Sequence, residues 1–282
     1  AGGTVNVVTK GGTNKLHGTA GDFNQVSKFA ATPFFTNKAG QKKPVTRFNQ
    51  WGVTAGAPVI VPRVFNGTNR VFWYFGYDAI KQGLPAPFTL TVPTAAMRNG
   101  NFSELLPLGS VYQLYDPQTA VAEGDRRRRQ PFAGNVIPAN RINAVAKNFL
   151  PYYPLPNQPG RNNGQDNYLA NSVDLEDYTN FLGRLDFSLS DRHKLFWNIR
   201  ENNRYHPLDD LFENKATGTD RIRGNWGSTA DDVYTFNPTT LLNVRLSWNR
   251  YDDSDHHRSE GFDISSLGFP PSIAAASRRP MI

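Results

Sequence analysis

The hydrophobic positions of residues 178–202 recur at every second residue on both sides of a short polar turn at residues 190–194. The apolar set before the turn consists of Phe181, Gly183, Leu185, Phe187 and Leu189. The set after the turn consists of Leu195, Trp197 and Ile199. A period of two is typical of a strand with one apolar and one polar face. The pattern therefore predicts a β-hairpin, and each arm approaches the ~9–11 residues that a tilted strand needs to cross a bilayer.

The same period recurs along much of the chain and predicts seven strands. These strands are expected over residues 17–29, 47–61, 70–80, 178–189, 195–202, 225–236 and 241–251, after a shorter strand at 4–8. Residues 81–173 interrupt the series, because they are rich in Pro, Gly and Asn and show no sustained periodicity. So long a stretch without a pattern predicts an irregular loop, which is rare in a compact soluble domain.

The predicted connections alternate between long and short. Short turns fall at residues 62–69, 190–194 and 237–240, and long loops fall at 30–46, 81–174, 205–224 and beyond 252. In an up-and-down meander this order collects every long loop at one end, as in outer-membrane barrels. All five tryptophans lie in predicted strands, as an aromatic girdle requires. The combination favours an all-β, antiparallel up-and-down transmembrane barrel over a soluble sheet with one wet face.

The composition excludes several classes of protein. Hydrophobic residues make up 38% of the chain, the mean hydropathy is −0.53, and no apolar run approaches the ~18 residues of a spanning helix. A barrel is compatible with these values, because alternating strands average to a polar composition. The absence of cysteine excludes disulfide scaffolds, Cys-zinc sites and thiol nucleophiles.

The net charge of +7 comes in large part from the run Arg126–Arg129. We weighed a nucleic-acid-binding patch against a solvated loop for this run. The loop interpretation is preferred, because neither a helical pattern nor an aromatic stacking platform accompanies the arginines. No nucleic-acid partner is expected.

Other polar clusters give no catalytic or metal site by their spacing. The segment Asp252–His257 combines carboxylates with imidazoles that suit a divalent metal, but a hydrophilic external loop is preferred, because no ligand spacing on a regular element supports a metal site. The pairs Asp209–Asp210 and Asp231–Asp232 are sequence neighbours, whereas glycosidase carboxylates face each other across a cleft. No phosphate-binding, serine-hydrolase or zinc-protease motif is present in the sequence. We therefore expect no enzyme, no cofactor and no metal.

Several stretches resemble TonB-dependent outer-membrane receptors. Residues 2–14, GGTVNVVTKGGTN, resemble the junction where the plug of such a receptor ends, and His17-Gly18 resembles the start of its first barrel strand. Further stretches resemble the Oar-like branch in order and spacing: Phe48–Gly52, Gly56–Pro58, Val92–Thr94, Arg98–Ser103, Tyr115–Thr119, Gly134–Pro138 and Asn140–Ile142. The resemblance extends to about residue 251. Gly11 departs from it where a small hydroxyl residue is more common, and Ala57 where a second glycine is common.

The resemblance implies that residues 1–16 are the C-terminal end of a plug domain and that residues 17–282 are the N-terminal part of a plugged barrel of about 22 strands. Residues 81–174 would form a long external loop. It also implies a place in the outer membrane of a Gram-negative bacterium, contact with outer-membrane lipid, and a TonB complex that acts through an upstream segment. The chain would then be a fragment, because open sheet edges are unsatisfied in lipid.

The implied function is the transport of a bulky solute that the sequence does not identify. The lumen-facing candidates are the polar residues of the predicted strands: Arg184, Asp186, Asn198, Arg200, Asn243 and Arg245. They would contact plug or solute, or would simply solvate the barrel wall. The alternative function is a soluble β-rich module or adhesin that binds a carbohydrate or a protein.

Overall fold

The computed structural model describes residues 3, 9–32, 34–38, 43 and 45–277. The chain divides into two compact units, which we describe separately. The sheet unit comprises residues 1–85, 173–208 and 220–255, and the loop unit comprises residues 86–172, 209–219 and 256–282. No helix in the described ranges is both long enough and apolar enough to span a membrane. The strand predicted at residues 4–8 lies outside the described residues.

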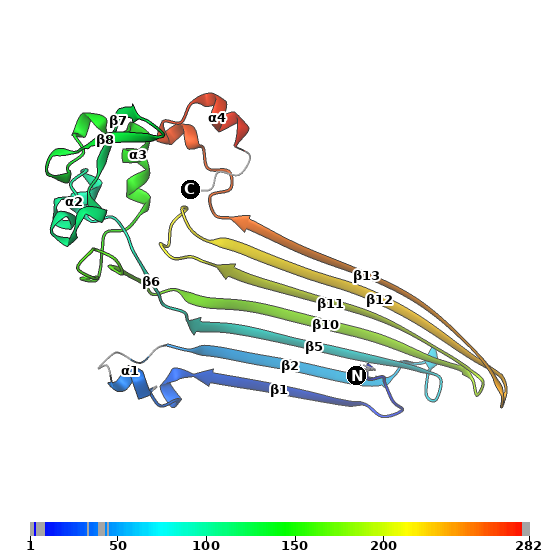
Figure 1. The fold of residues 1–282 in the computed structure, drawn as a ribbon. Helices are drawn as coiled ribbons and strands as arrows, with labels where there is room; N and C mark the ends of the chain where they lie inside the picture. Colours follow the sequence, from blue (N-terminus) through cyan, green and yellow to red (C-terminus); the bar gives the residue numbers. More distant parts are fainter. Residues whose placement is uncertain (1–2, 4–8, 33, 39–42, 44, 278–282) are drawn as a thin grey trace. The chain divides into compact units, whose positions relative to one another are not determined.

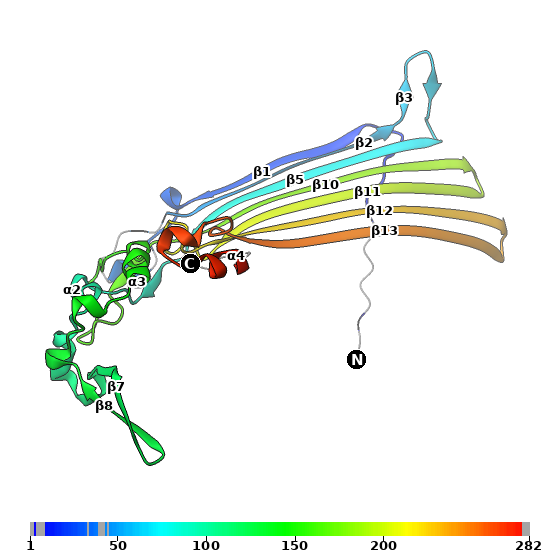
Figure 2. The same ribbon diagram turned by 90° about the horizontal axis from the view of Figure 1, so that it is seen from above.

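The sheet unit is one seven-stranded sheet in which each strand lies beside the strand before it (Figure 1). Its strands are β1 His17–Val26, β2 Arg47–Pro58, β5 Val71–Pro85, β10 Val173–Ser190, β11 His193–Leu208, β12 Thr219–Asn237 and β13 Thr240–His257. The pairs β1–β2, β2–β5, β5–β10 and β10–β11 are antiparallel. The all-β, up-and-down prediction is confirmed. Among the described residues the sheet is open, with β1 and β13 at its edges (Figure 2).

One face of the sheet is apolar, because cross-strand partners share a face and the alternation stays in phase from strand to strand. Trp73 lies opposite Leu185, which in turn lies opposite Trp197. The apolar face of these strands carries Trp51, Val53, Trp73, Phe75, Tyr77, Phe181, Leu185, Phe187, Trp197 and Ile199.

The last two strands continue this apolar face. The indole N–H of Trp197 donates to Ser228 Oγ at 2.8 Å, and the guanidinium of Arg250 lies 6.0 Å from the ring centre of Trp226. The even-numbered residues of β12 and β13 therefore belong to it, Trp248 among them. All five tryptophans lie in strands, as predicted, and all five share the apolar face.

The observed strands are longer than the segments in which hydrophobic and polar residues alternate. β10, β11, β12 and β13 contain 18, 16, 19 and 18 residues. The predicted loops at 205–224 and directly after 252 were therefore wrong, because β11 and β12 reach to residues 208 and 219 and β13 reaches to 257. In the extensions of β12 and β13 most side chains are polar, so the period of two disappears there, whereas Val173 and Leu175 of β10 keep it. Cross-strand ion pairs such as Arg221–Asp255 replace apolar contacts there.

The connections keep the predicted alternation of lengths only in part, because the connection at 209–218 has ten residues and is shorter than the twelve-residue connection at 59–70. The short ones are residues 191–192, 238–239 and 59–70, the last folded into a small hairpin of β3 Ile60–Val61 and β4 Phe65–Asn66. The long ones are residues 27–46, 86–172, 209–218 and the segment after 257. The first contains η1 Ser27–Phe29 and α1 Phe34–Lys38.

The prediction of an irregular loop at 81–174 was wrong, because residues 86–172 form most of a folded unit. Two small antiparallel pairs occur in it, β6 Phe88–Leu90 with β9 Tyr168–Ala170 and β7 Tyr115–Glu123 with β8 Arg126–Pro131. Its helices are α2 Ala95–Arg98, η2 Ser103–Leu108, η3 Ser110–Tyr112, η4 Ala133–Asn135, η5 Ala139–Arg141, α3 Ala144–Phe149, η6 Leu150–Tyr152, η7 Ile264–Leu267 and α4 Pro271–Ala276.

Polar side chains that bond to the backbone hold the loop unit together. The fully buried Asn135 accepts from the N–H of Leu114 at 2.6 Å and donates to the carbonyls of Phe102 and Tyr112 at 2.9 and 3.1 Å. Asn167, which is 2% exposed, bonds to both the N–H and the carbonyl of Val92 at 2.8 Å. Such bonds satisfy the buried backbone where no long strand or helix does so.

Candidate functional site on the polar face

The polar face of the sheet gathers the predicted lumen-facing residues. Arg184 lies opposite Asn198, Arg200 lies opposite Leu182, and Asp186 lies opposite Phe196, so the candidates of β10 and β11 share one face. Asn243 and Arg245 of β13 both bond to Asp231 of β12. The structure thus brings four of the six candidates into two clusters, and the other two, Asn198 and Arg200, lie on the same face.

The first cluster is an arginine fork on β10. Arg184 pairs with Asp186 at 2.6 Å, and its guanidinium lies 4.0 Å from the ring centre of Phe196. Its side chain is only 12% exposed. The remaining guanidinium N–H groups donate to Thr9, at 2.5 Å to Oγ1 and 3.2 Å to the carbonyl oxygen. Arg184 therefore ties the chain before β1 to the polar face.

The segment held in this way, residues 9–16, is called the junction segment below. Its two glycines approach the sheet closely. A Cβ atom on Gly12 would lie 2.4 Å from the carbonyl oxygen of Trp73, and one on Gly11 would lie 2.8 Å from Asp186 Oδ2. The absence of a side chain at Gly12 is therefore required for this contact.

The remainder of the junction segment is fixed by hydrogen bonds. Asn14 Oδ1 accepts from the backbone N–H of Asn69 at 2.7 Å, in the short connection between β2 and β5. Thr13 Oγ1 bonds to the carbonyl of Lys15 at 3.0 Å and lies 3.2 Å from His17 Nδ1. β1 begins at His17, the residue at which the sequence predicted the first barrel strand. The assignment of residues 1–16 to a plug remains a prediction.

The second cluster surrounds Asp231, which is 2% exposed. Its carboxylate accepts from Asn243 Nδ2 at 2.5 Å and from Arg245. Sequence analysis alone offers no reason to choose Asp231 over Asp232, because adjacent residues of a strand differ only in the face they occupy. Asp232 lies on the other face, where it contacts His193 at 2.7 Å. The two carboxyls therefore do not face one cleft.

Asn198 and Arg200 complete the polar row. Asn198 is 4% exposed, and among the described residues its Oδ1 has no hydrogen-bond partner. The guanidinium of Arg200 passes over Gly227, where a Cβ atom would lie 2.7 Å from its Nε. The glycine in β12 thus makes room for the arginine of β11.

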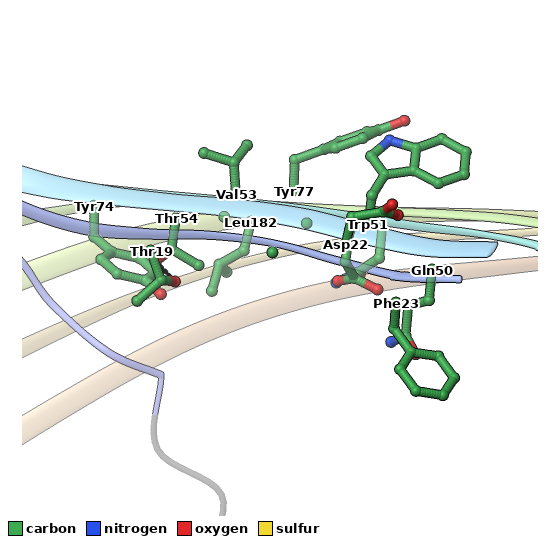
Figure 3. A pocket seen from close by; sticks show the side chains of 15 residues that line it. Thr19, Asp22, Phe23, Gln50, Trp51, Val53, Thr54, Tyr74, Tyr77 and Leu182 are labelled. Carbon is green, nitrogen blue, oxygen red and sulfur yellow. Dashed lines mark hydrogen bonds between the residues drawn. The ribbon is translucent and has the colours of Figure 1, made fainter. Parts of the chain in front are cut away.

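A recess lies in the polar face over β1, β2 and β5. It has a volume of about 520 Å³, and Gly21, Gly52 and Gly76 contribute no side chain to it. In Figure 3, Thr54 and Tyr74 lie on one side of the strands, whereas Val53 and Tyr77 lie on the other. This division follows from the pairing of Thr54 with Gly76 and of Val53 with Tyr77.

A family model described as an outer membrane beta barrel domain matches residues 8–281. The chain belongs to this family. It is therefore an outer-membrane β-barrel protein of a Gram-negative bacterium. The comparisons with curated proteins and with solved structures gave no match.

For this outer-membrane barrel domain, the remaining sequence candidates lie in ion pairs or at the surface. The segment Asp252–His257 is the end of β13, where Asp253 and Asp255 pair with Arg223 and Arg221. Within the described ranges, no group of three or more His, Asp or Glu side chains is arranged to hold a metal ion. The run Arg126–Arg129 is solvated, as predicted, but it forms the exposed strand β8 of a hairpin and not an irregular loop.

Proposed function

We propose that the chain is part of a TonB-dependent outer-membrane receptor that binds a bulky solute and transports it across the outer membrane. The observation that carries the proposal is the junction segment, which Arg184 holds against the polar face directly before β1. A receptor with a plug inside its barrel needs a passage of this kind, where the chain leaves the interior and enters the wall. The motifs of residues 2–14 support the same assignment.

In this proposal the apolar face with the five tryptophans meets lipid and the polar face lines the interior. Large apolar side chains with flanking tryptophans suit the hydrocarbon layer and its boundaries. Arginines and buried carboxylates are costly in lipid, so Arg184, Arg245 and Asp231 belong on the inner side. The open edges at β1 and β13 pair with further strands, because unpaired backbone is not tolerated in lipid.

The proposal also assigns a role to the recess and to the loop unit. The glycine-lined recess over β1, β2 and β5 allows a plug to approach the wall closely. The loop unit stands as the external part that contacts solute first, and the TonB complex supplies the energy that moves the plug. Transport through this interior needs no catalytic chemistry and no cofactor.

The test compares the growth medium of three strains: the parent, a strain without the full-length gene, and a strain without TonB. We expect the same solutes to remain in the medium of both mutants while the parent depletes them. Depletion that persists without TonB, or that is unaffected by loss of this gene, contradicts the proposal.

The role of the loop is tested separately by deletion of residues 86–172 from the full-length protein. Pro85 and Val173 are direct cross-strand partners, so a short turn joins β5 to β10 without moving either strand. We expect the deleted protein to reach the outer membrane and to migrate differently before and after boiling, while solute depletion stops. Unchanged depletion would show that the loop does not contact the solute.

A further inference from the structure

The β7–β8 hairpin presents four successive arginines, Arg126–Arg129, and all four are exposed. Within the described part of the chain, none of them makes an ion pair or a side-chain hydrogen bond. Two other arginines of the loop unit stabilise its fold. Arg98 donates hydrogen bonds to four backbone carbonyls, and Arg141 pairs with Asp116. The charge of the hairpin is thus available to a partner.

The base of the hairpin is fixed before any partner arrives. Arg141 donates two hydrogen bonds to the carboxylate of Asp116, at 2.7 and 2.9 Å. Thr119 Oγ1 accepts from the N–H of Gln130 at 2.8 Å and ties β7 to β8. Figure 2 shows the hairpin extending away from α2 and α3 of its own unit. A preorganised strand loses little conformational entropy when it binds.

A groove of about 600 Å³ follows β8 and is lined by Tyr115, Arg127, Arg128, Arg129, Gln130 and Pro131. Tyr115 lies opposite Pro131, so Arg127 and Arg129 occupy the same face as the tyrosine ring. Alternate residues of a strand are about 6.6 Å apart, which spaces the two guanidinium groups along the groove. Arg128 also lines the groove, so Arg126 is the one arginine of the run outside its lining.

These side chains combine three kinds of recognition. Guanidinium forks pair with carboxylate or phosphate groups. The half-exposed ring of Tyr115 offers an apolar surface with a polar tip, and the amide of Gln130 both donates and accepts hydrogen bonds. Nucleic-acid binders stack successive bases on several aromatic rings, whereas this groove has one.

We propose that this groove binds an acidic glycan outside the cell. The partner is a polysaccharide whose carboxylates pair with Arg127 and Arg129 while a sugar ring packs on Tyr115. This inference deepens the ligand-contact role of the loop given under the proposed function. Because it is tested as binding, its failure is distinguishable from a failure of transport.

The test measures binding of polygalacturonate to the full-length protein in detergent, by calorimetry. The double variant Arg127→Gln/Arg129→Gln is expected to bind about tenfold more weakly, the size of two lost exposed charge pairs. Two single variants are compared as a matched pair: Arg129→Gln in the groove is expected to lose about threefold, and Arg126→Gln, which removes the same charge outside the groove lining, is expected to lose less than about twofold. Asp125→Asn, in the hairpin turn, removes a negative charge and is expected to strengthen binding. Affinity falls as salt is added.

Three further probes are measured beside polygalacturonate: poly-L-glutamate, single-stranded DNA and neutral dextran. The proposal requires that polygalacturonate binds more tightly than each of them. Equal losses in Arg126→Gln and Arg129→Gln, or equally tight binding of poly-L-glutamate or DNA, overturn the glycan site in favour of nonspecific charge. Variants that bind normally but aggregate would show that the arginines only protect a strand edge, and this also overturns it.

Discussion

At the scale of single residues, the glycines of the polar face decide which segments reach the sheet. Gly12 lets the junction segment approach the backbone of Trp73, and Gly227 lets Arg200 pass over β12. Gly18 is similar, because a Cβ atom there would lie 2.4 Å from the carbonyl oxygen of Thr54. These positions exclude side chains for steric reasons and not because of unusual backbone angles.

Replacement of Gly12 by alanine is expected to displace the junction segment from the polar face. The new methyl group would overlap the carbonyl oxygen of Trp73, and overpacking of this kind costs about 1–3 kcal/mol. Tryptic cleavage after Lys10 in the full-length protein should become faster. Gly21→Ala is the matched control, because no atom lies within 4 Å of its Cβ position. Equal cleavage rates in the two variants would contradict the close contact.

The Asp116–Arg141 pair predicts acid sensitivity of the β7–β8 hairpin. The hydrogen bond from Arg141, and then that from the N–H of Gln118, lower the pKa of the Asp116 carboxyl below its usual 3.8. Because the folded pKa is depressed, the pair contributes its full stability above the unfolded value and loses it as pH falls through the folded value.

The expected result is constant hydrogen-exchange protection of the hairpin from neutral pH down to about pH 4, and a decline below it. Protection is taken relative to the intrinsic exchange rate at each pH. Asp116→Asn should lower protection at neutral pH and abolish its acid dependence. A decline that is identical in the variant would assign the effect to other groups.

The sequence could identify the polar face but not the partners on it. Period-two alternation alone places Arg184, Asn198 and Arg245 on a wet face. Their contacts depend on register, which decides that Arg245 meets Asp231 of the neighbouring strand. The hydrogen bonds between the Asn135 side chain and the backbone depend on tertiary packing, and no residue spacing in the sequence indicates them.

At the scale of elements, β12 and β13 each have an apolar band and a mostly polar extension. β12 shows this change, since it begins with Thr219–Arg223 and reaches Trp226 only later. The sequence predicted the apolar bands and missed the extensions. Hydrophobic residues alternate with polar ones only where one face of a strand is apolar and the other is polar. The loop unit was missed for a related reason: its short elements give no period and are held by side-chain bonds to the backbone.

A charge placed on the apolar band should be costly, whereas one on the next residue should not. Leu246 of β13 lies on the apolar face with 71% of its surface exposed, and Ser247 lies on the polar face beside Thr229. Leu246→Lys is expected to destabilise the full-length protein in lipid vesicles by about 2–4 kcal/mol, and Ser247→Lys by less than about 1 kcal/mol. Urea titration of the vesicle-inserted protein measures the change in the free energy of unfolding for both variants. Equal costs would contradict the assignment of lipid to the apolar face.

At the scale of the whole molecule, the proposal requires the junction segment to change place during transport. The chain contains no cysteine, so a single engineered pair has no competing thiols. In Gly11→Cys/Asp186→Cys the two new side chains arise at positions that are in contact in the structure. Oxidation is expected to lock the segment and stop solute depletion in cells that carry the full-length protein, and a reductant should restore it.

The two single-cysteine variants control for the loss of Asp186 and should not respond to oxidant. Depletion that continues in the oxidised double variant, with the disulfide shown to be formed, would mean that the segment stays in place during transport.

The central claim is that the apolar face of this sheet meets lipid and the polar face meets the aqueous interior of an outer-membrane barrel. The most direct test is a nitroxide scan of residues 242–249 of β13, one cysteine at a time, in the full-length protein in membranes. The account predicts that collision with oxygen is high at the even positions and collision with a water-soluble nickel complex is high at the odd ones. Uniform access of the nickel complex along the strand would contradict it.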